Sequence, residues 1–276
     1  MDYRAHFMVD PAKRPDLSGI DPDFHDAPSD RAAGEALAAT NLDRIAAAQT
    51  RLFAEGGRAV LICLQGMDAS GKDGVVTSIM HRVNPMGCAV QSFKTPTERE
   101  KAHDFLWRIH AAAPAKGRIG IFNRSHYEAV LIEKVHKLAS PDVIGQRYRQ
   151  IAEFERLLGE TGTTVIKFFL HISVQEQLSR FKDRLDDPLK RWKISEADYA
   201  ERRHWDEYMR AYEDALANCS TAEAPWYVIP SNHKWFRDMA ISQITAATLD
   251  DMKIPVAEPG LDLALIRRKY HEAAEQ

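Results

Sequence analysis

The segment LQGMDASGKDG, which begins at residue 64, has the glycine and lysine spacing of a Walker A phosphate-binding loop. Gly66 and Gly71 allow the chain to curl so that successive amide N–H groups point inward. A helix that begins near Lys72 adds the positive end of its dipole, so the loop forms a cup for phosphate oxygens that includes Ala69 and Ser70. Lys72 would contact the outer phosphates as a point charge. The pattern also occurs in unrelated turns, so its structural context decides whether it binds phosphate.

Two aspartates distinguish this loop from the common pattern. Asp73 stands where a serine or threonine normally follows the lysine, and an ionised carboxylate accepts hydrogen bonds but repels bare phosphate. Asp73 is therefore either a metal contact through water or a first-turn acid that interacts with the helix dipole. Asp68 would bind magnesium or take a proton from the acceptor, unless it forms an Asx turn that shapes the loop. We favour the metal role for Asp68, because the usual hydroxyl ligand is missing.

Length and composition favour one large domain in a reducing compartment. The chain has 276 residues, of which 45% are apolar, and a formal net charge of -3 that excludes neither an anionic ligand nor a nucleic acid. Its three cysteines lack the spacing of a zinc site or a disulfide framework, so we expect buried thiols and a cytoplasmic location. No apolar stretch reaches the roughly 20 residues of a membrane span, and the start lacks a signal-peptide apolar region.

Apolar runs and helical periodicity alternate along the chain. Residues 1–30 are rich in proline and aspartate, which is typical of an extended arm laid on the surface or partly disordered. The remaining domain, residues 31–276, is predicted to hold strands at 58–64, 88–93, 118–122, 163–172 and 226–230, and helices at 30–55, 98–112, 141–158, 173–184, 195–217 and 235–250. Alternating strands and helices predict an α/β fold with a parallel five-stranded sheet covered on both faces.

Ligands of such sheets bind beyond the carboxyl ends of the strands. The Walker A candidate follows the first strand, and KTPT, which offers Lys94 for phosphate, follows the second. NRSHYE, residues 123–128, follows the third strand and is rich in polar groups. The sequence therefore predicts that three strand ends converge on one polar site.

The NRSHYE segment departs from the usual Walker B element, which places an aspartate at the strand end. Asn123 stands at this position and is a weaker, uncharged metal ligand, so Asp68 becomes the main anionic one. Arg124 suits bidentate phosphate contacts, with a surface ion pair as the alternative. Glu128 either contacts the acceptor nucleotide or faces water on a helix.

The segment RFKDRLDDPLKRWK, residues 180–193, concentrates positive charge. A solvated helix face is the usual interpretation of such a run, but Pro188 breaks the helix as a mobile lid requires. We therefore predict a helical lid at about 180–203 that closes over phosphates and stabilises the charge on the transferred group. Its basic residues are Arg180, Lys182, Arg184, Lys190, Arg191 and Lys193.

Taken in order, four segments resemble polyphosphate kinase family 2. They are LQGMDASGKDG, the stretch from VNPMG to IEKVH that contains NRSHYE, RFKDRLDDPLKRWK, and APWYVIPSNHKWFRD, and together they span roughly residues 40 to 255. Asn123 resembles the class III branch, whereas other branches have aspartate there. The resemblance implies a reversible, magnesium-dependent transfer, with manganese as a substitute, between inorganic polyphosphate and adenine nucleotides. For class III it implies that both nucleoside mono- and diphosphates are accepted and that ATP is formed.

The resemblance also implies roles for individual residues. Asp68 would be the loop acid at the metal and the acceptor, Lys72 would hold phosphate, and Asn123 and Arg124 would occupy the Walker B position. Arg180 and Arg184 fall in the lid, whose basic residues would line the polyphosphate path. The implied fold is a P-loop kinase core resembling thymidylate kinase, assembled as dimers or tetramers.

Three other functions compete with polyphosphate-dependent phosphoryl transfer. An ATP-dependent nucleoside monophosphate kinase would share the cup, the lid and the sheet, and donor preference would separate the two. A GTPase switch is disfavoured because the chain has no Asn-Lys-x-Asp guanine-binding element. Nucleic-acid binding is disfavoured because the basic residues cluster at the predicted site and do not form a broad stripe.

Overall fold

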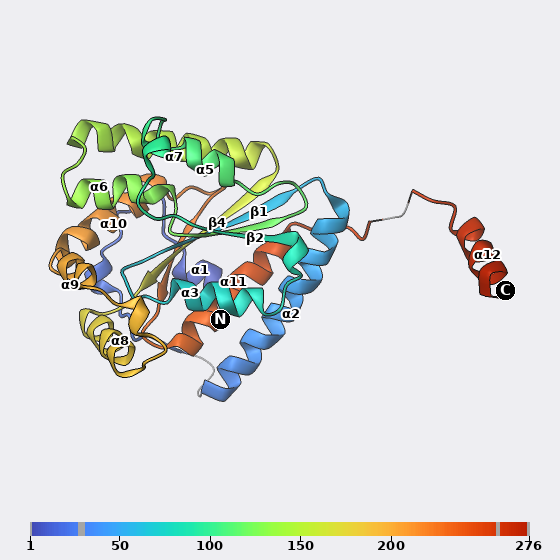
Figure 1. Ribbon diagram of the computed structural model, residues 1–276, viewed down its shortest axis with the longest axis horizontal. Helices are drawn as coiled ribbons and strands as arrows, with labels where there is room; N and C mark the ends of the chain where they lie inside the picture. Colours follow the sequence, from blue (N-terminus) through green and yellow to red (C-terminus); the bar gives the residue numbers. More distant parts are fainter. Residues whose placement is uncertain (1, 27–30, 258–259, 275–276) are drawn as a thin grey trace.

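The computed structural model describes residues 2–26, 31–257 and 260–274, and these form an α/β fold around one parallel sheet (Figure 1). The sheet has five strands in the order β2-β3-β1-β4-β5, and every neighbouring pair is parallel. The strands are β1 (Ala59–Gln65), β2 (Cys88–Ser92), β3 (Ile119–Asn123), β4 (Thr163–His171) and β5 (Trp226–Pro230). The predicted fold class and all five predicted strands are confirmed.

The central strands are largely buried because helices cover both faces of the sheet. All seven residues of β1 are buried, as expected of a parallel strand between two layers. Successive side chains of β1 point to opposite faces: Val60 and Ile62 belong to one core cluster and Leu61 and Cys63 to another. β2 is one of the two edge strands of the sheet, and only its first residue is buried.

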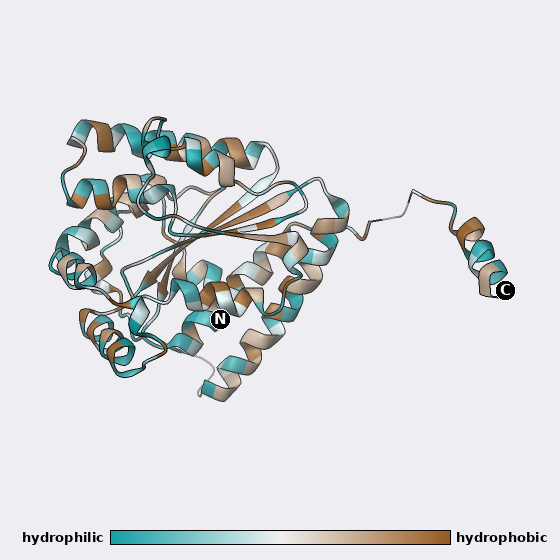
Figure 2. Cartoon of the chain, viewed as in Figure 1, coloured by the Kyte–Doolittle hydropathy of each residue, from teal (hydrophilic) through white to brown (hydrophobic). Residues whose placement is uncertain are grey.

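Helices lie in a layer on each side of the sheet (Figures 1 and 2). One layer contains α1 (Tyr3–Phe7), α2 (Arg31–Glu55), α3 (Lys72–Met80) and α11 (Lys234–Asp251). The other contains α5 (Trp107–Ala112), α6 (Ile132–Val135), α7 (Pro141–Glu160) and α10 (Trp205–Cys219). In both layers the apolar side chains face the sheet, so each layer closes its own part of the core.

Two predicted helices are each broken into two. The predicted helix at 98–112 is α4 (Glu98–Lys101) and α5, because the Asp104 carboxylate accepts a hydrogen bond from the Leu106 N–H at 2.9 Å and holds a turn between them. The predicted helix at 195–217 is α9 (Glu196–Arg202) and α10. Here tight i→i+3 bonds from the N–H groups of Arg203 and His204 end α9.

The two ends of the chain differ. In the predicted N-terminal arm, Tyr3 and Phe7 are buried against α11, and the Val9 N–H donates to the Trp226 carbonyl at 2.8 Å, beside the β5 edge. Residues 27–30 of the arm lie outside the described residues. At the other end, α12 (Leu263–Ala274) stands away from the body with every described side chain exposed, and periodicity had not predicted it (Figure 1).

The cysteines and the helices also bear on the predicted cellular setting. Cys63, Cys88 and Cys219 are free and buried, as predicted. Within the described ranges, none of the helices combines the length and the apolar character that crossing a bilayer requires.

Candidate active site

The loop between β1 and α3 adopts the predicted curled conformation. Gly66, Ala69 and Gly71 have φ angles of 149°, 63° and 105°. A Cβ on Gly66 would lie 2.8 Å from the carbonyl oxygen of Leu170, so a side chain there would collide with the β4 backbone. The loop therefore packs directly on the sheet, and glycine is required at its first turn.

Lys72 begins α3 and reaches back across the loop. Its Nζ donates to the carbonyl oxygens of Gly66 at 2.7 Å and Met67 at 3.1 Å, and the side chain is buried. Burial and the charge of Arg124 lower the pKa of Lys72 to about 8, although nearby carboxylates oppose the shift. The ammonium group is thus held within the cup and is cationic below about pH 8.

Arg180 supports the loop from behind, which differs from its predicted place in a mobile lid. It lies in α8 (Val174–Asp186), is 5% exposed, and its guanidinium donates to the Glu176 carboxylate and to the carbonyl oxygens of Ala69, Ser70, Ser231 and Asn232. All five N–H donors of an arginine are thereby used. Arg180 fixes the loop to the end of β5 and has no donor left for polyphosphate.

A second buried arginine, Arg237 of α11, also lies against the loop and was missed by the sequence analysis. Its Nη1 would be 1.9 Å from a Cβ on Gly71, so it fills the space that the glycine leaves. Its guanidinium pairs with Asp238 at 2.7 Å. A basic residue beside two aromatic residues in the segment WFRD was the available signal.

The end of β3 places Arg124 between two carboxylates. Arg124 has a φ of 59°, and its guanidinium pairs with Asp68 at 2.5 Å and with Glu128 at 3.4 Å. Gln65 at the end of β1 donates to Glu128 at 3.1 Å. Burial alone would lower the pKa of Arg124, but Glu128 and Asp68 raise it. The loop acid, the strand-end arginine and Glu128 therefore form one connected array.

Asp73 occupies the position at which three segments meet. One of its carboxylate oxygens accepts from the Asn123 side-chain amide at 2.8 Å, and the other accepts from Lys193 Nζ at 3.2 Å. Burial would raise the pKa of Asp73, but these two hydrogen bonds, together with the charges of Lys193 and Lys72, lower it. Asn123 is thus a hydrogen-bond donor to the loop helix in this structure.

The segment that follows α8 has the predicted break at Pro188, after which a 3₁₀ turn, η4 (Arg191–Lys193), leads to α9. Arg184 donates to the Lys193 carbonyl at 2.9 Å, Lys190 pairs with Asp187 at 2.7 Å, and Arg191 donates to the Leu185 carbonyl at 2.9 Å. These three cations, which were predicted to bind phosphate, hold the segment together. Lys193 instead reaches Asp73 at the rim of the cup, and the motion of the lid stays a prediction.

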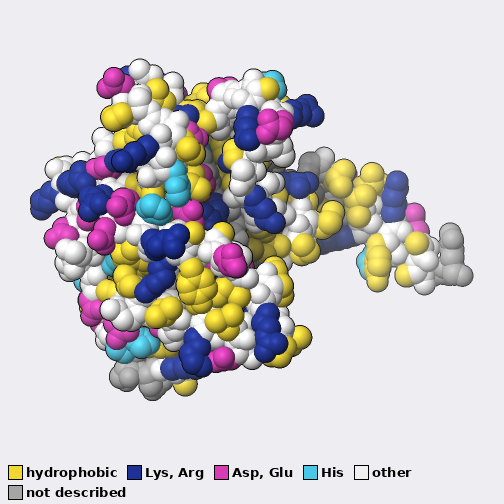
Figure 3. All heavy atoms as spheres, turned by 60° about the vertical axis from the view of Figure 1, so that its left-hand side comes forward, with side chains coloured by type: hydrophobic (Ala, Val, Ile, Leu, Met, Phe, Trp, Pro, Cys, Tyr) yellow, Lys and Arg dark blue, Asp and Glu magenta, His cyan; other side chains and the backbone are white. Residues whose placement is uncertain are grey.

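A cavity of about 820 Å³ opens beside the loop. The sequence predicted some of the residues that line it but not the cavity itself. Gly66, Asp68, Lys94, Arg124 and Glu128 all line it, so the structure brings these predicted residues together. Lys and Arg side chains lie on both sides of the hollow on this face (Figure 3).

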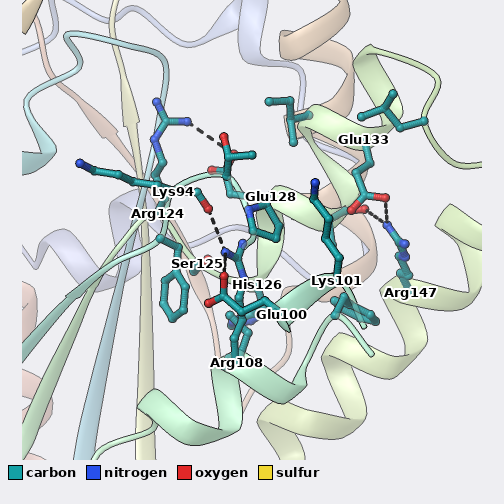
Figure 4. A pocket seen from close by; sticks show the side chains of 18 of the residues that line it. Lys94, Glu100, Lys101, Arg108, Arg124, Ser125, His126, Glu128, Glu133 and Arg147 are labelled. Atoms are coloured by element: carbon teal, nitrogen blue, oxygen red, sulfur yellow. Dashed lines mark hydrogen bonds and ion pairs between the residues drawn. The ribbon is translucent and has the colours of Figure 1, made fainter. Parts of the chain in front are cut away.

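The walls of this cavity come from several helices and from the loops between them. Arg124 and Lys94 lie at one end of it, and Arg147 with Glu133 lies at the other (Figure 4). Arg147 pairs with Glu133 at 2.5 Å and its guanidinium lies 5.2 Å from the Phe105 ring. Arg108 donates to the Lys94 carbonyl at 2.8 Å. The cavity is thus charged at both ends, with an aromatic side chain in its wall.

The carboxylates around the cup suit a hard cation. Within the described ranges, no group of three or more His, Cys, Asp or Glu side chains could hold a metal ion. Asp68 and Asp73 nevertheless flank the loop, and Mg²⁺ is commonly bound by one or two carboxylates together with substrate phosphates and water. The residues therefore fit a magnesium ion that is completed by the phosphates, and do not form a closed protein cage.

A parallel sheet with a Walker A loop after its first strand, a lysine in the cup and a charged cavity beside it define a P-loop kinase. The model of one family, described as "Polyphosphate kinase 2 (PPK2)", matches residues 29–257. The chain belongs to this family.

Relatives at high coverage support the assignment. The chain is 48% identical to the AMP/ADP-polyphosphate phosphotransferase of Meiothermus ruber, over 92% of this chain and 95% of that protein. It is 42% identical to the ADP-polyphosphate phosphotransferase of Rhodopseudomonas palustris, over 80% of this chain and 81% of that protein. The crystal structure of polyphosphate kinase 2 from Arthrobacter aurescens TC1 is similar with a TM-score of 0.91 at 41% identity, over 96% of this chain and 98% of that chain.

Proposed function

We propose that this protein transfers the terminal phosphoryl group of inorganic polyphosphate to AMP and ADP, forming ADP and ATP in a reversible reaction. The observation that carries the proposal is a two-sided site: a phosphate cup with Lys72 on one side, the 820 Å³ cavity on the other, and Asp68 and Arg124 between them. The name of the relative from Meiothermus ruber, an AMP/ADP-polyphosphate phosphotransferase, supports both acceptors, and that of the relative from Rhodopseudomonas palustris, an ADP-polyphosphate phosphotransferase, supports ADP.

The cup is the donor side. Positive potential for the terminal phosphates comes from the inward amide groups of the loop, from the start of α3 and from the Lys72 ammonium. None of these groups needs to contact a nucleotide base. Lys193 lies at its rim, bonded to Asp73, and extends the positive surface toward the lid. A long polyanion needs this kind of extension beyond a single loop.

The cavity is the acceptor side. Its volume lies within the range of small-molecule sites, about 300–1,000 Å³. Arg124 and Lys94 at the end nearest the cup would bind the acceptor phosphates, and Phe105 offers an apolar surface to the base. Glu128 would orient Arg124, with which it is paired.

The transfer itself depends on position and charge, because the phosphoryl group passes through a loose transition state. Arg124 lies where donor and acceptor phosphates would meet, so its guanidinium would stabilise the charge on the transferred oxygens. Asp68 would hold the magnesium or manganese ion, which when bound neutralises phosphate charge. Asp68 also keeps Arg124 oriented through their ion pair.

We further propose a homo-oligomeric enzyme, a dimer or tetramer, in the cytoplasm. The family resemblance supports the assembly, and the free, buried cysteines suit a reducing compartment.

The direct test supplies the protein with magnesium, long-chain polyphosphate and either AMP or ADP, and separates the nucleotides by chromatography. We expect ADP from AMP and ATP from ADP, and loss of both products in Lys72→Ala and Asp68→Asn. Transfer from ATP to AMP without transfer from polyphosphate would instead establish a nucleoside monophosphate kinase.

A further inference from the structure

Asp73 is bonded on both of its oxygens, and its partners come from two other segments. Asn123 at the end of β3 donates to one carboxylate oxygen at 2.8 Å, and Lys193 in η4, which belongs to the predicted lid, donates to the other at 3.2 Å. Asp73 itself lies in the first turn of α3, directly after the cup lysine. The three residues thus connect the strand end, the loop helix and the lid at one point.

The amide at position 123 is matched to the carboxylate at position 73. An aspartate at 123 would bring two carboxylates within contact distance, and the repulsion between two ionised carboxylates is relieved only when they share a proton or when a cation lies between them. A Walker B aspartate together with a serine or threonine after the lysine would meet no such conflict, since the hydroxyl can donate. The two departures from the common pattern therefore compensate each other.

We infer that Asp73 and Asn123 act as one positioning unit, which keeps a single negative charge at this point and uses it to hold the lid through Lys193. The inference deepens the proposed function and rests on it, because the competing partner of Lys193 is the donor phosphate. In the absence of donor, Lys193 bonds to Asp73. When polyphosphate enters the cup, Lys193 exchanges the carboxylate for a phosphate oxygen.

The exposure of the ion pair suits such an exchange. The side chains of Lys193 and Asp73 are 33% and 63% exposed, so water screens their attraction. A pair of this kind changes the population of a closed lid by up to about fivefold. Asn123 fixes the carboxylate by a bond to the body of the protein, so Lys193 can leave without disturbing the loop.

The first test measures the lid without any activity. Lys190, Arg191 and Lys193 are sites for trypsin, and the rate of cleavage in this segment reports how often the lid opens. Asp73→Asn should raise this rate by up to about fivefold relative to wild type. Asp43→Asn, which removes an exposed carboxylate paired with Arg82 at 2.9 Å, is the matched control and should leave the rate unchanged. Equal cleavage of the wild type and the Asp73→Asn variant would overturn the inference.

The second test is a double-variant cycle on kcat/KM for polyphosphate. Asn123→Asp alone should lower this quantity by about tenfold, because the repulsion between the two carboxylates moves Asp73 from its place beside the cup. Adding Asp73→Asn exchanges the amide and the carboxylate and restores their hydrogen bond, so kcat/KM of the double variant should return to about that of Asp73→Asn alone. If kcat/KM of the double variant is equal to or lower than that of Asn123→Asp alone, the inference that the two residues act as one unit is wrong.

The two proposals fail in different ways. If wild-type protein moves no phosphoryl group from polyphosphate, the proposed function fails, while trypsin cleavage still tests the bond between the lid and Asp73. If the wild type is active but the exchange in the double variant restores nothing, the function stands and the positioning unit is wrong.

Discussion

The cup and the cavity are built differently, although they share Gly66, Asp68 and Arg124. Behind the cup, Arg180 and Arg237 are only 5% and 3% exposed, and the Arg180 guanidinium is bonded to the backbone on two sides. The cavity walls come from several helices and loops, and charged side chains in them pair with each other at partly exposed positions, such as Arg147 with Glu133. The donor side is therefore preorganised, whereas the acceptor side can re-pair its charges around different nucleotides.

This difference suits the two substrates. The terminal phosphates of polyphosphate are the same in every turnover, so a fixed cup has its donors in place before binding. The acceptor is a monophosphate in one reaction and a diphosphate in the other, so its pocket must accommodate two lengths.

Removal of the cup lysine should have the largest effect. Lys72→Ala takes away the one ammonium held within the loop and should lower kcat/KM for polyphosphate by about 10³-fold. Steady-state kinetics at saturating nucleotide measure this loss. A decrease of less than tenfold would show that the amide groups alone carry the donor phosphates.

Arg180→Met tests the rigid support of the cup. It leaves the carbonyl oxygens of Ala69, Ser70, Ser231 and Asn232 without this donor, so we expect a loss of about 3 kcal/mol in the free energy of unfolding. Urea unfolding measures it. Arg184→Met, one turn further along α8, removes a guanidinium with one bond to the Lys193 carbonyl and should cost less than about 1 kcal/mol. Equal losses of unfolding free energy in the two variants would mean that Arg180 stabilises the protein no more than an ordinary arginine of α8.

The pH dependence follows from the burial of Lys72. Because its pKa is lowered to about 8, the free enzyme loses this positive charge as the pH rises through that value. We expect kcat/KM for polyphosphate to fall about tenfold per pH unit above the break. In Lys72→Arg the side chain keeps its positive charge over this pH range. The fall of kcat/KM above about pH 8 should therefore be absent in this variant, even if its overall activity is lower. A wild-type profile that is flat from pH 7 to 10 would contradict the assignment.

Local sequence patterns predicted those parts of the molecule that depend on local forces. Continuous apolar runs such as that of β1 follow from burial on both faces, and the loop follows from glycines at fixed spacing. Arg180 was misplaced because its partners, such as the Ser70 and Ser231 carbonyls, are far away in the sequence. The amide of Asn123 could be seen as a departure from Walker B, but its bond to Asp73 depends on how β3 packs against α3.

The most direct test of the two-sided site measures the KM values for polyphosphate and for AMP in two variants side by side. Lys193→Met removes the lid cation at the cup, and Arg147→Met removes the guanidinium at the far end of the cavity. The account predicts that Lys193→Met raises the KM for polyphosphate several-fold and leaves the KM for AMP unchanged, and that Arg147→Met does the reverse. Variants that both raise the KM of the same substrate would contradict a donor cup and an acceptor cavity on opposite sides of Arg124.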